Sequence, residues 1–158
     1  MDVAVVATIL IVVGFFVFHA EKESARIPKI PDTISAKLLF TPYMPTKLPQ
    51  GFEIDQNSYT LQETALIFTA SSKSGGHLVF SEQSVPKDLS MDEFYSTNIT
   101  SPERLDGLKY KTIFGKLQGR EGTLGSITTD DNTWVLVTMP KQATKDDIQT
   151  IEQGLVKQ

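Results

Sequence analysis

The chain has 158 residues, no cysteine, a formal net charge of −4 and a sequence pI near 5.1. The acidic balance argues against a nucleic-acid partner, because phosphate recognition needs a basic face. The absence of cysteine excludes disulfides, thiol nucleophiles and cysteine metal ligands.

The first predicted element is an apolar run, Val3–Phe18, which has no charged residue and whose only polar side chain is Thr8. As a helix, residues 3–20 span about 27 Å, close to the ~30 Å of a hydrocarbon core. We therefore predict a transmembrane anchor over residues 1–20. A cleaved signal peptide is the alternative, but no basic side chain precedes the run, and Phe18 or Glu23 would stand at the −3 position of the two cleavage sites that alanines suggest.

The orientation of this anchor depends on basic residues near its ends. None precedes the run, whereas Lys22, Arg26, Lys29 and Lys37 follow it, which read literally puts the rest of the chain in the cytoplasm. We expect, however, that a basic N-terminal piece is missing from this sequence, and restoring it would reverse the count. We therefore predict a single-pass protein of the cell membrane with an extracytoplasmic domain.

Residues 21–39 are predicted to form a tether and a short helix. Pro28 and Pro31 favour extended backbone in the tether. The short helix would then bury one apolar face, formed by Ile34, Leu38 and Leu39.

Residues 40–158 predict one α+β domain. Alternating apolar residues and turn signals predict about six strands. They lie near 52–59 and at 65–71, 77–85, 108–114, 121–129 and 133–139. Residues 100–107 are predicted to form a loop. Ser90 and Glu93 form a capping box that begins a short internal helix. Thr144 begins a C-terminal helix whose apolar face includes Ile148 and Ile151. Because short turns join most strands, we predict an antiparallel sheet with the C-terminal helix packed on it.

Few side chains in this domain have the spacing of a chemical site. His77 is its only histidine and begins a strand next to Gly75-Gly76, which is typical of a solvated hairpin residue. The run 130–132 offers oxygen ligands for calcium but lacks the distal glutamate of a calcium-binding loop. Residues 115–125 are rich in glycine but lack the Gly-Lys-Ser/Thr of a phosphate-binding loop. Their small side chains leave room for a groove. We predict no catalytic residue, metal or cofactor.

The short motif Leu48-Pro49-Gln50-Gly51-Phe52, followed by a strand, resembles the entry of DUF4367-type domains. The hairpin that ends in Phe80-Ser81-Glu82-Gln83 and the late strand with Trp134 fit the same order. The resemblance covers roughly residues 40–157. It implies an envelope domain behind a single membrane helix, as in bacterial proteins that resemble anti-sigma or sporulation-linked regulators. The family brings no established activity, so it assigns no functional residue.

Three functions follow as hypotheses. The first is a non-catalytic binding or sensing module whose partner is an envelope protein. The second is a carrier-like domain for an apolar ligand such as a lipid or lipoprotein acyl chain. A carrier cavity would be lined by large aromatic side chains, and the candidates are Phe68, Phe80, Phe114 and Trp134. Such side chains more often fill a core. The third is a hydrolase that uses only carboxylates. The predicted partners are the membrane, through Val3–Phe18, and either an envelope protein or an apolar ligand.

Overall fold

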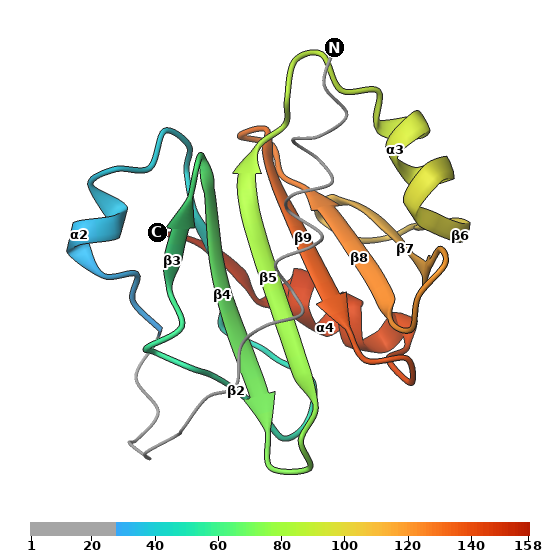
Figure 1. Cartoon of the computed structure of the whole chain (residues 1–158), viewed down its shortest axis with the longest axis horizontal. Helices are drawn as coiled ribbons and strands as arrows, with labels where there is room; N and C mark the ends of the chain where they lie inside the picture. Colours follow the sequence, from blue (N-terminus) through green and yellow to red (C-terminus); the bar gives the residue numbers. More distant parts are fainter. Residues whose placement is uncertain (1–27) are drawn as a thin grey trace.

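The computed structural model describes residues 28–158, which form a strongly twisted antiparallel sheet with short helices (Figure 1). The strands of this sheet follow the order β2-β4-β5-β9-β8-β7-β6, and β3 also pairs with β4. Their bounds are β2 (Phe52–Ile54), β3 (Thr60–Gln62), β4 (Ala65–Ser72), β5 (His77–Ser84), β6 (Ile99–Leu105), β7 (Lys111–Leu117), β8 (Thr123–Thr128) and β9 (Thr133–Met139). Every neighbouring pair is antiparallel, as predicted, but the sheet has eight strands where about six were expected.

The helices are α2 (Asp32–Ser35), α3 (Met91–Asn98) and α4 (Lys145–Gly154). The predicted start of α3 is confirmed, because the Glu93 amide donates to the Ser90 hydroxyl at 3.3 Å. The start of α4 is also confirmed, because the Thr144 amide donates to the Asp147 carboxylate at 2.7 Å. The helix α2 is shorter than expected. Leu39 is 86% exposed, so the prediction that it shares a buried face was wrong.

A second, two-stranded sheet pairs β1 (Tyr43–Pro45) with β10 (Leu155–Lys157), close to the C-terminus. We call this sheet the terminal ribbon. Sequence patterns do not reveal this ribbon, because β1 directly follows Pro42 and ends at Pro45, and each strand is three residues long.

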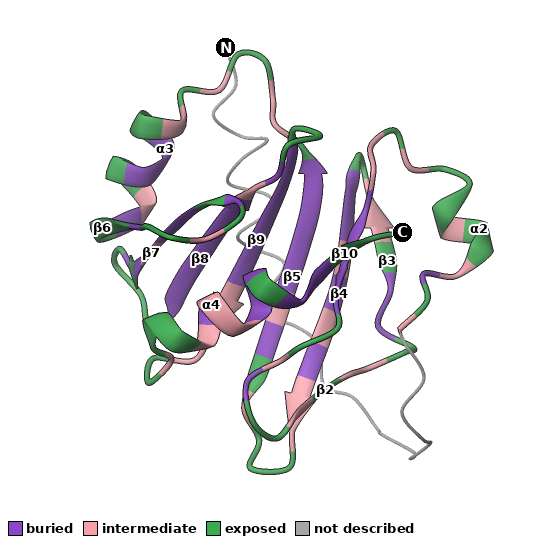
Figure 2. Cartoon of the chain, turned by 180° about the vertical axis from the view of Figure 1, so that it is seen from behind, coloured by how far each residue is buried: buried purple, intermediate pink, exposed green. Residues whose placement is uncertain are grey.

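The two faces of the large sheet are covered unequally. α4 and the terminal ribbon pack on one face, where Phe68, Phe80 and Val137 join Ile148 in the larger core. Gly125 permits this close packing, because a Cβ atom at this position would collide with the Ile148 side chain. On the opposite face, α3 buries Phe94 and Tyr95 over β7, β8 and β9 and builds a smaller core. Figure 2 shows α4 in front of the sheet and α3 at one end of it.

Residues 99–105 form the edge strand β6, so the prediction of a loop over 100–107 was wrong. The pattern is misleading because the five residues between Ile99 and Leu105 are exposed and have no apolar alternation. Ser101 adopts a positive φ of 50°, and the pairing with β7 shifts register between Thr100 and Glu103. This irregularity breaks the two-residue repeat on which strand prediction depends.

Within the described residues, 28–158, no helix is long and apolar enough to cross a membrane. The predicted anchor, residues 1–20, lies outside them, as does the tether up to residue 27. Part of the segment assigned to the tether belongs to the folded unit. Ile30 is only 3% exposed within the larger core, and Ile34 and Leu38 pack against that core.

Candidate functional site

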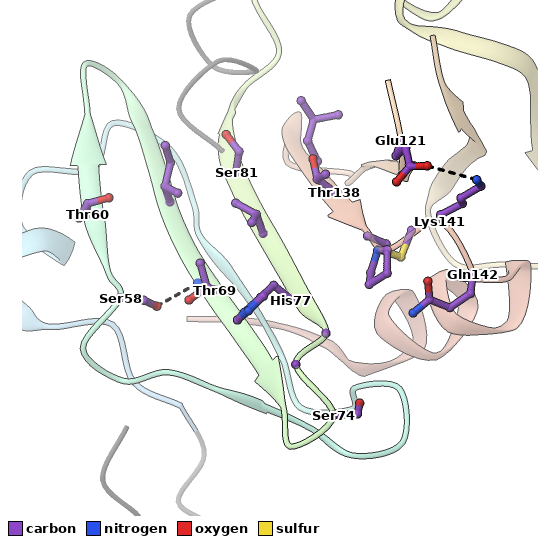
Figure 3. Close-up of a pocket in the computed structure, with 18 of the residues that line it drawn as sticks. Ser58, Thr60, Thr69, Ser74, His77, Ser81, Glu121, Thr138, Lys141 and Gln142 are labelled. Atoms are coloured by element: carbon purple, nitrogen blue, oxygen red, sulfur yellow. Dashed lines mark hydrogen bonds and ion pairs between the residues drawn. The ribbon is translucent and has the colours of Figure 1, made fainter. Parts of the chain in front are cut away.

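The half of the sheet that α3 leaves uncovered forms a cleft of about 690 Å³. Its floor is the outer face of β4, β5 and β9, on the side opposite α4 (Figure 3). Each of these strands supplies one aliphatic side chain and at least one hydroxyl side chain to the floor: Ile67 and Thr69, Val79 and Ser81, Leu136 and Thr138. The volume lies within the ~300–1,000 Å³ that is usual for small-molecule sites.

Strand register explains why these six side chains share one face. Val79 of β5 pairs with Thr69 of β4 and with Thr138 of β9. Ser81 pairs with Ile67 and Leu136 in the same way. Because side chains alternate between the two faces of a strand, the intervening Phe80 points into the larger core.

One wall of the cleft comes from the segment between β2 and β3, which Ser58 fastens to the sheet. The Ser58 hydroxyl donates to the Asp55 carbonyl oxygen at 2.7 Å and accepts from the Thr69 amide at 2.9 Å. Another boundary is the β4–β5 turn, where Gly75 has a positive φ of 86° that glycine adopts without strain. These contacts anchor the boundaries to the strands that form the floor.

The third boundary holds the only acid and the only lysine among the described lining residues. Glu121, between β7 and β8, forms an ion pair with Lys141, just after β9, at 3.3 Å. Both side chains are mostly exposed. The floor itself has no charged side chain among these residues.

Ser81 has an unusual environment. The residue is 8% exposed, and its hydroxyl oxygen has no hydrogen-bond partner within residues 28–158. A buried hydroxyl without a partner loses its hydration and gains nothing in return, at a cost of about 1–3 kcal/mol. Such an atom on a cleft floor marks a position where a ligand atom gains a hydrogen bond.

The four aromatic residues predicted to line a cavity lie elsewhere. Phe68 and Phe80 stack with ring centroids 4.7 Å apart inside the larger core. Phe114 packs partly buried against the same core. Trp134 lies in the smaller core, 4.8 Å from the ring of Phe94. The residues that line the cleft are therefore different from these four. Their trace in the sequence is the alternation of hydroxyl and aliphatic residues in the strands within residues 67–81.

His77 lies at the cleft, exposed, with its Nδ1 atom 3.0 Å from the Ser71 hydroxyl. A nucleophilic site needs a third group that orients the histidine. No acidic contact to His77 appears among the hydrogen bonds and ion pairs of the described residues. This arrangement is that of a polar cross-strand pair at the end of a hairpin.

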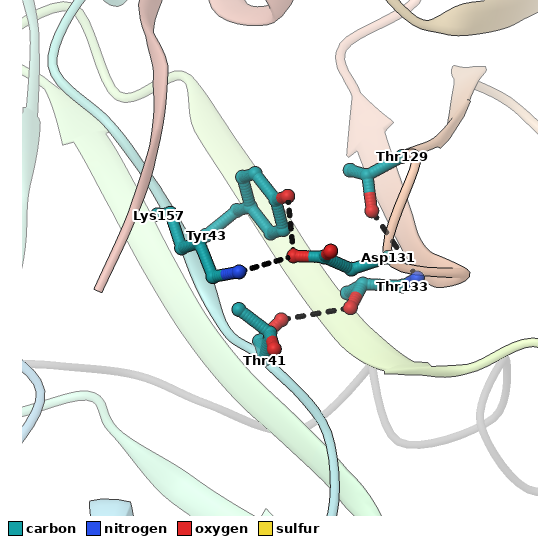
Figure 4. A network of polar contacts seen from close by, with 6 residues as sticks. All are labelled: Thr41, Tyr43, Thr129, Asp131, Thr133 and Lys157. Carbon is teal, nitrogen blue, oxygen red and sulfur yellow. Dashed lines mark hydrogen bonds and ion pairs between the residues drawn. The ribbon is translucent and has the colours of Figure 1, made fainter.

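The Asp130–Asn132 turn contacts both strands of the terminal ribbon. Asp131 accepts a hydrogen bond from the Tyr43 hydroxyl at 3.0 Å and pairs with Lys157 at 2.8 Å (Figure 4). The lysine contact, followed by that of Tyr43, lowers the pKa of the Asp131 carboxyl. Within residues 28–158 no group of three or more histidine, cysteine or acidic side chains is placed to hold a metal ion.

Two buried carboxylates lie on the other side of the sheet. Glu82 accepts from the Tyr43 amide at 2.9 Å, and Glu152 accepts from the Tyr110 amide at 2.7 Å. Burial raises the pKa of Glu82 to about 8, although the Tyr43 amide opposes that rise. Neither acid lines the cleft. Their hydrogen bonds hold β1 and the start of β7 to the core.

The described residues thus form a small α+β fold with a preformed, ligand-sized cleft on the sheet face that α3 leaves uncovered. No family model, no curated protein and no solved structure matches this chain. The resemblance to DUF4367-type domains therefore stays a prediction.

Proposed function

We propose that this chain is a single-pass, membrane-anchored, extracytoplasmic binding module whose ligand occupies the cleft. The observation that carries the proposal is the unequal covering of the sheet. α3 closes the face over β7, β8 and the start of β9, while among the described residues the same face of β4, β5 and the end of β9 stays open as a cleft of about 690 Å³. A preformed concave site that combines apolar contacts with placed polar groups is the usual form of a small-molecule site.

The carrier-like function is the second candidate, and the aliphatic floor favours it. Ile67, Val79 and Leu136 lie on three strands of one face and offer an apolar body a continuous contact. The carboxylate hydrolase gains less support. Glu82 and Glu152 are both held by backbone amides on the opposite side of the sheet, away from the cleft.

Binding can be tested without knowing the natural ligand. The full-length chain is reconstituted in lipid nanodiscs with labelled Ile, Leu and Val methyl groups and titrated with 2-propanol. We expect the methyl resonances of Ile67 and Val79 to shift and saturate. Leu39 and Val156, which are exposed apolar residues outside the cleft, serve as internal controls. Equal, unsaturated shifts at all four residues would count against a binding cleft.

The extracytoplasmic location needs a separate test. A tag placed after Gln158 is exposed to protease in intact cells. Cleavage before lysis supports the proposed orientation. Protection until lysis contradicts it and places any partner in the cytosol.

A further inference from the structure

We propose that the cleft takes an uncharged amphipathic small molecule, with its apolar body on the aliphatic floor and its one polar group at the Ser81 hydroxyl. The polar group is a hydroxyl, amide or ester. This inference rests on the proposed function, because it names the ligand of the same cleft.

The charges around the cleft argue for an uncharged ligand. Among the described lining residues, the titratable side chains are His77, Glu121 and Lys141. Glu121 and Lys141 already neutralise each other, and both lie at the boundary (Figure 3). His77 is exposed and contacts Ser71. An ionic ligand on the floor would lose hydration without gaining an opposite charge, which is costly.

Ser81 determines where the polar group of the ligand lies. Its hydroxyl can donate one hydrogen bond and accept others, yet it makes none within residues 28–158. The Ser58 hydroxyl differs, because it already bonds the Asp55 carbonyl and the Thr69 amide. Ser58 therefore has a structural role at the wall, whereas Ser81 is a buried hydroxyl on the floor that lacks a partner within residues 28–158.

The apolar body of the ligand has a defined place beside Ser81. Ile67 and Leu136 are the direct cross-strand partners of Ser81 on β4 and β9. Val79 is two residues along β5 and shares the face of Ser81. The Ser81 hydroxyl is thus flanked by aliphatic side chains, which suits an amphipathic molecule that places a polar group there.

Three probes share a six-carbon chain and differ in the charge of their head group: 1-hexanol, hexanoate and hexylammonium. They separate the effect of ligand charge on binding from the effect of the apolar chain. Each is titrated into the full-length, methyl-labelled chain in nanodiscs. We expect hexanol to saturate the shifts of Ile67 and Val79 with a Kd at least tenfold lower than either ion. Equal affinity for hexanoate or hexylammonium overturns the inference but leaves the proposed function standing. No saturable shift with any probe overturns both.

Substitution of Ser81 tests the polar contact. Ser81→Ala removes a hydroxyl that has no partner, so the fold is retained, and we expect hexanol binding to weaken about threefold to tenfold. Ser84→Ala, on the same strand but outside the cleft, is the matched control and keeps wild-type affinity. Unchanged hexanol binding by Ser81→Ala overturns the assigned position of the polar group.

A charge added to the floor provides the reverse test. Thr138→Lys places a cation opposite Val79, and we expect it to reverse the preference from hexanol to hexanoate. If hexanoate binds no better to this variant, the uncharged floor does not set selectivity. Nuclear Overhauser contacts between Val79 and Val3–Phe18 in the ligand-free chain would show the cleft filled by its own N-terminal segment, which also overturns the inference.

Discussion

The two halves of the sheet have the same backbone pairing but different outer faces. In the half beneath α3, that face carries large side chains such as Ile113, Leu124 and Trp134, which are buried with Phe94. In the half that forms the cleft, the same face carries hydroxyls and branched aliphatic side chains. The side chains on the outer face thus indicate which half of the sheet is covered by a helix. The covered half has large apolar side chains, whereas the open half retains polar ones.

Truncation of Trp134 is expected to give the largest effect on the covered half. Its indole packs against Phe94 and donates to the Ser126 hydroxyl at 2.7 Å. Trp134→Ala should lower the free energy of unfolding by about 3–5 kcal/mol, measured by chemical denaturation. Trp134→Phe is the control and should cost less, because it retains an aromatic ring. A loss below about 0.5 kcal/mol for Trp134→Ala would contradict burial of this residue.

Ionisation of Glu82 should weaken the face that α4 and the terminal ribbon cover. Burial raises the folded-state pKa to about 8, so the folded chain holds a proton that the unfolded chain releases near its ordinary value. The free energy of unfolding should therefore fall by about 1 kcal/mol per pH unit between roughly pH 5 and pH 8, and level off above. Denaturation across this range measures the slope.

Glu82→Gln is the matched variant for this pH dependence. It keeps the size of the side chain and an oxygen that can accept from the Tyr43 amide, but it cannot ionise. We expect a flatter profile between pH 5 and pH 8. An identical slope in the variant would assign the pH dependence to other groups.

Addition of one methyl group at Gly125 tests the close packing of α4 on β8. Gly125→Ala should destabilise the fold by about 1–3 kcal/mol, because the new Cβ meets the Ile148 side chain. Ile148→Ala makes room for that Cβ, so the double variant should lose less than the two single variants added together. Strict additivity would mean that α4 does not rest on Gly125.

Much of this fold follows from local patterns in the sequence. Capping residues locate α3 and α4, and alternation with turn residues locates the central hairpin and β9. The terminal ribbon does not follow from them. Its strands are three residues long and are separated by most of the chain, so only the tertiary fold brings them together. β6 is missed because it is an exposed, irregular edge strand.

The cleft was harder to predict than the sheet. Aromatic side chains are the strongest apolar signal, but strand alternation directs Phe68 and Phe80 into the core and away from the cleft. Thr69, Ser81 and Thr138 alternate with aliphatic residues, but this alternation is common on solvated strands and does not by itself distinguish a cleft from an ordinary exposed face. Whether a solvated sheet face becomes a cleft depends on where α3 ends and on the loops that form the cleft walls. The sequence of a single strand predicts neither of these features.

The smallest expected effect compares two adjacent residues of β5. Val79→Ala should cost less than about 1 kcal/mol, because Val79 is only partly buried and lines the cleft. Phe80→Ala should cost about 3–5 kcal/mol, because the Phe80 ring is fully buried and stacks on Phe68. Chemical denaturation of both variants gives the difference directly. Equal losses would mean that the outer face of β5 is as closely packed in solution as the inner one, and the contrast between the open and covered halves would then fail.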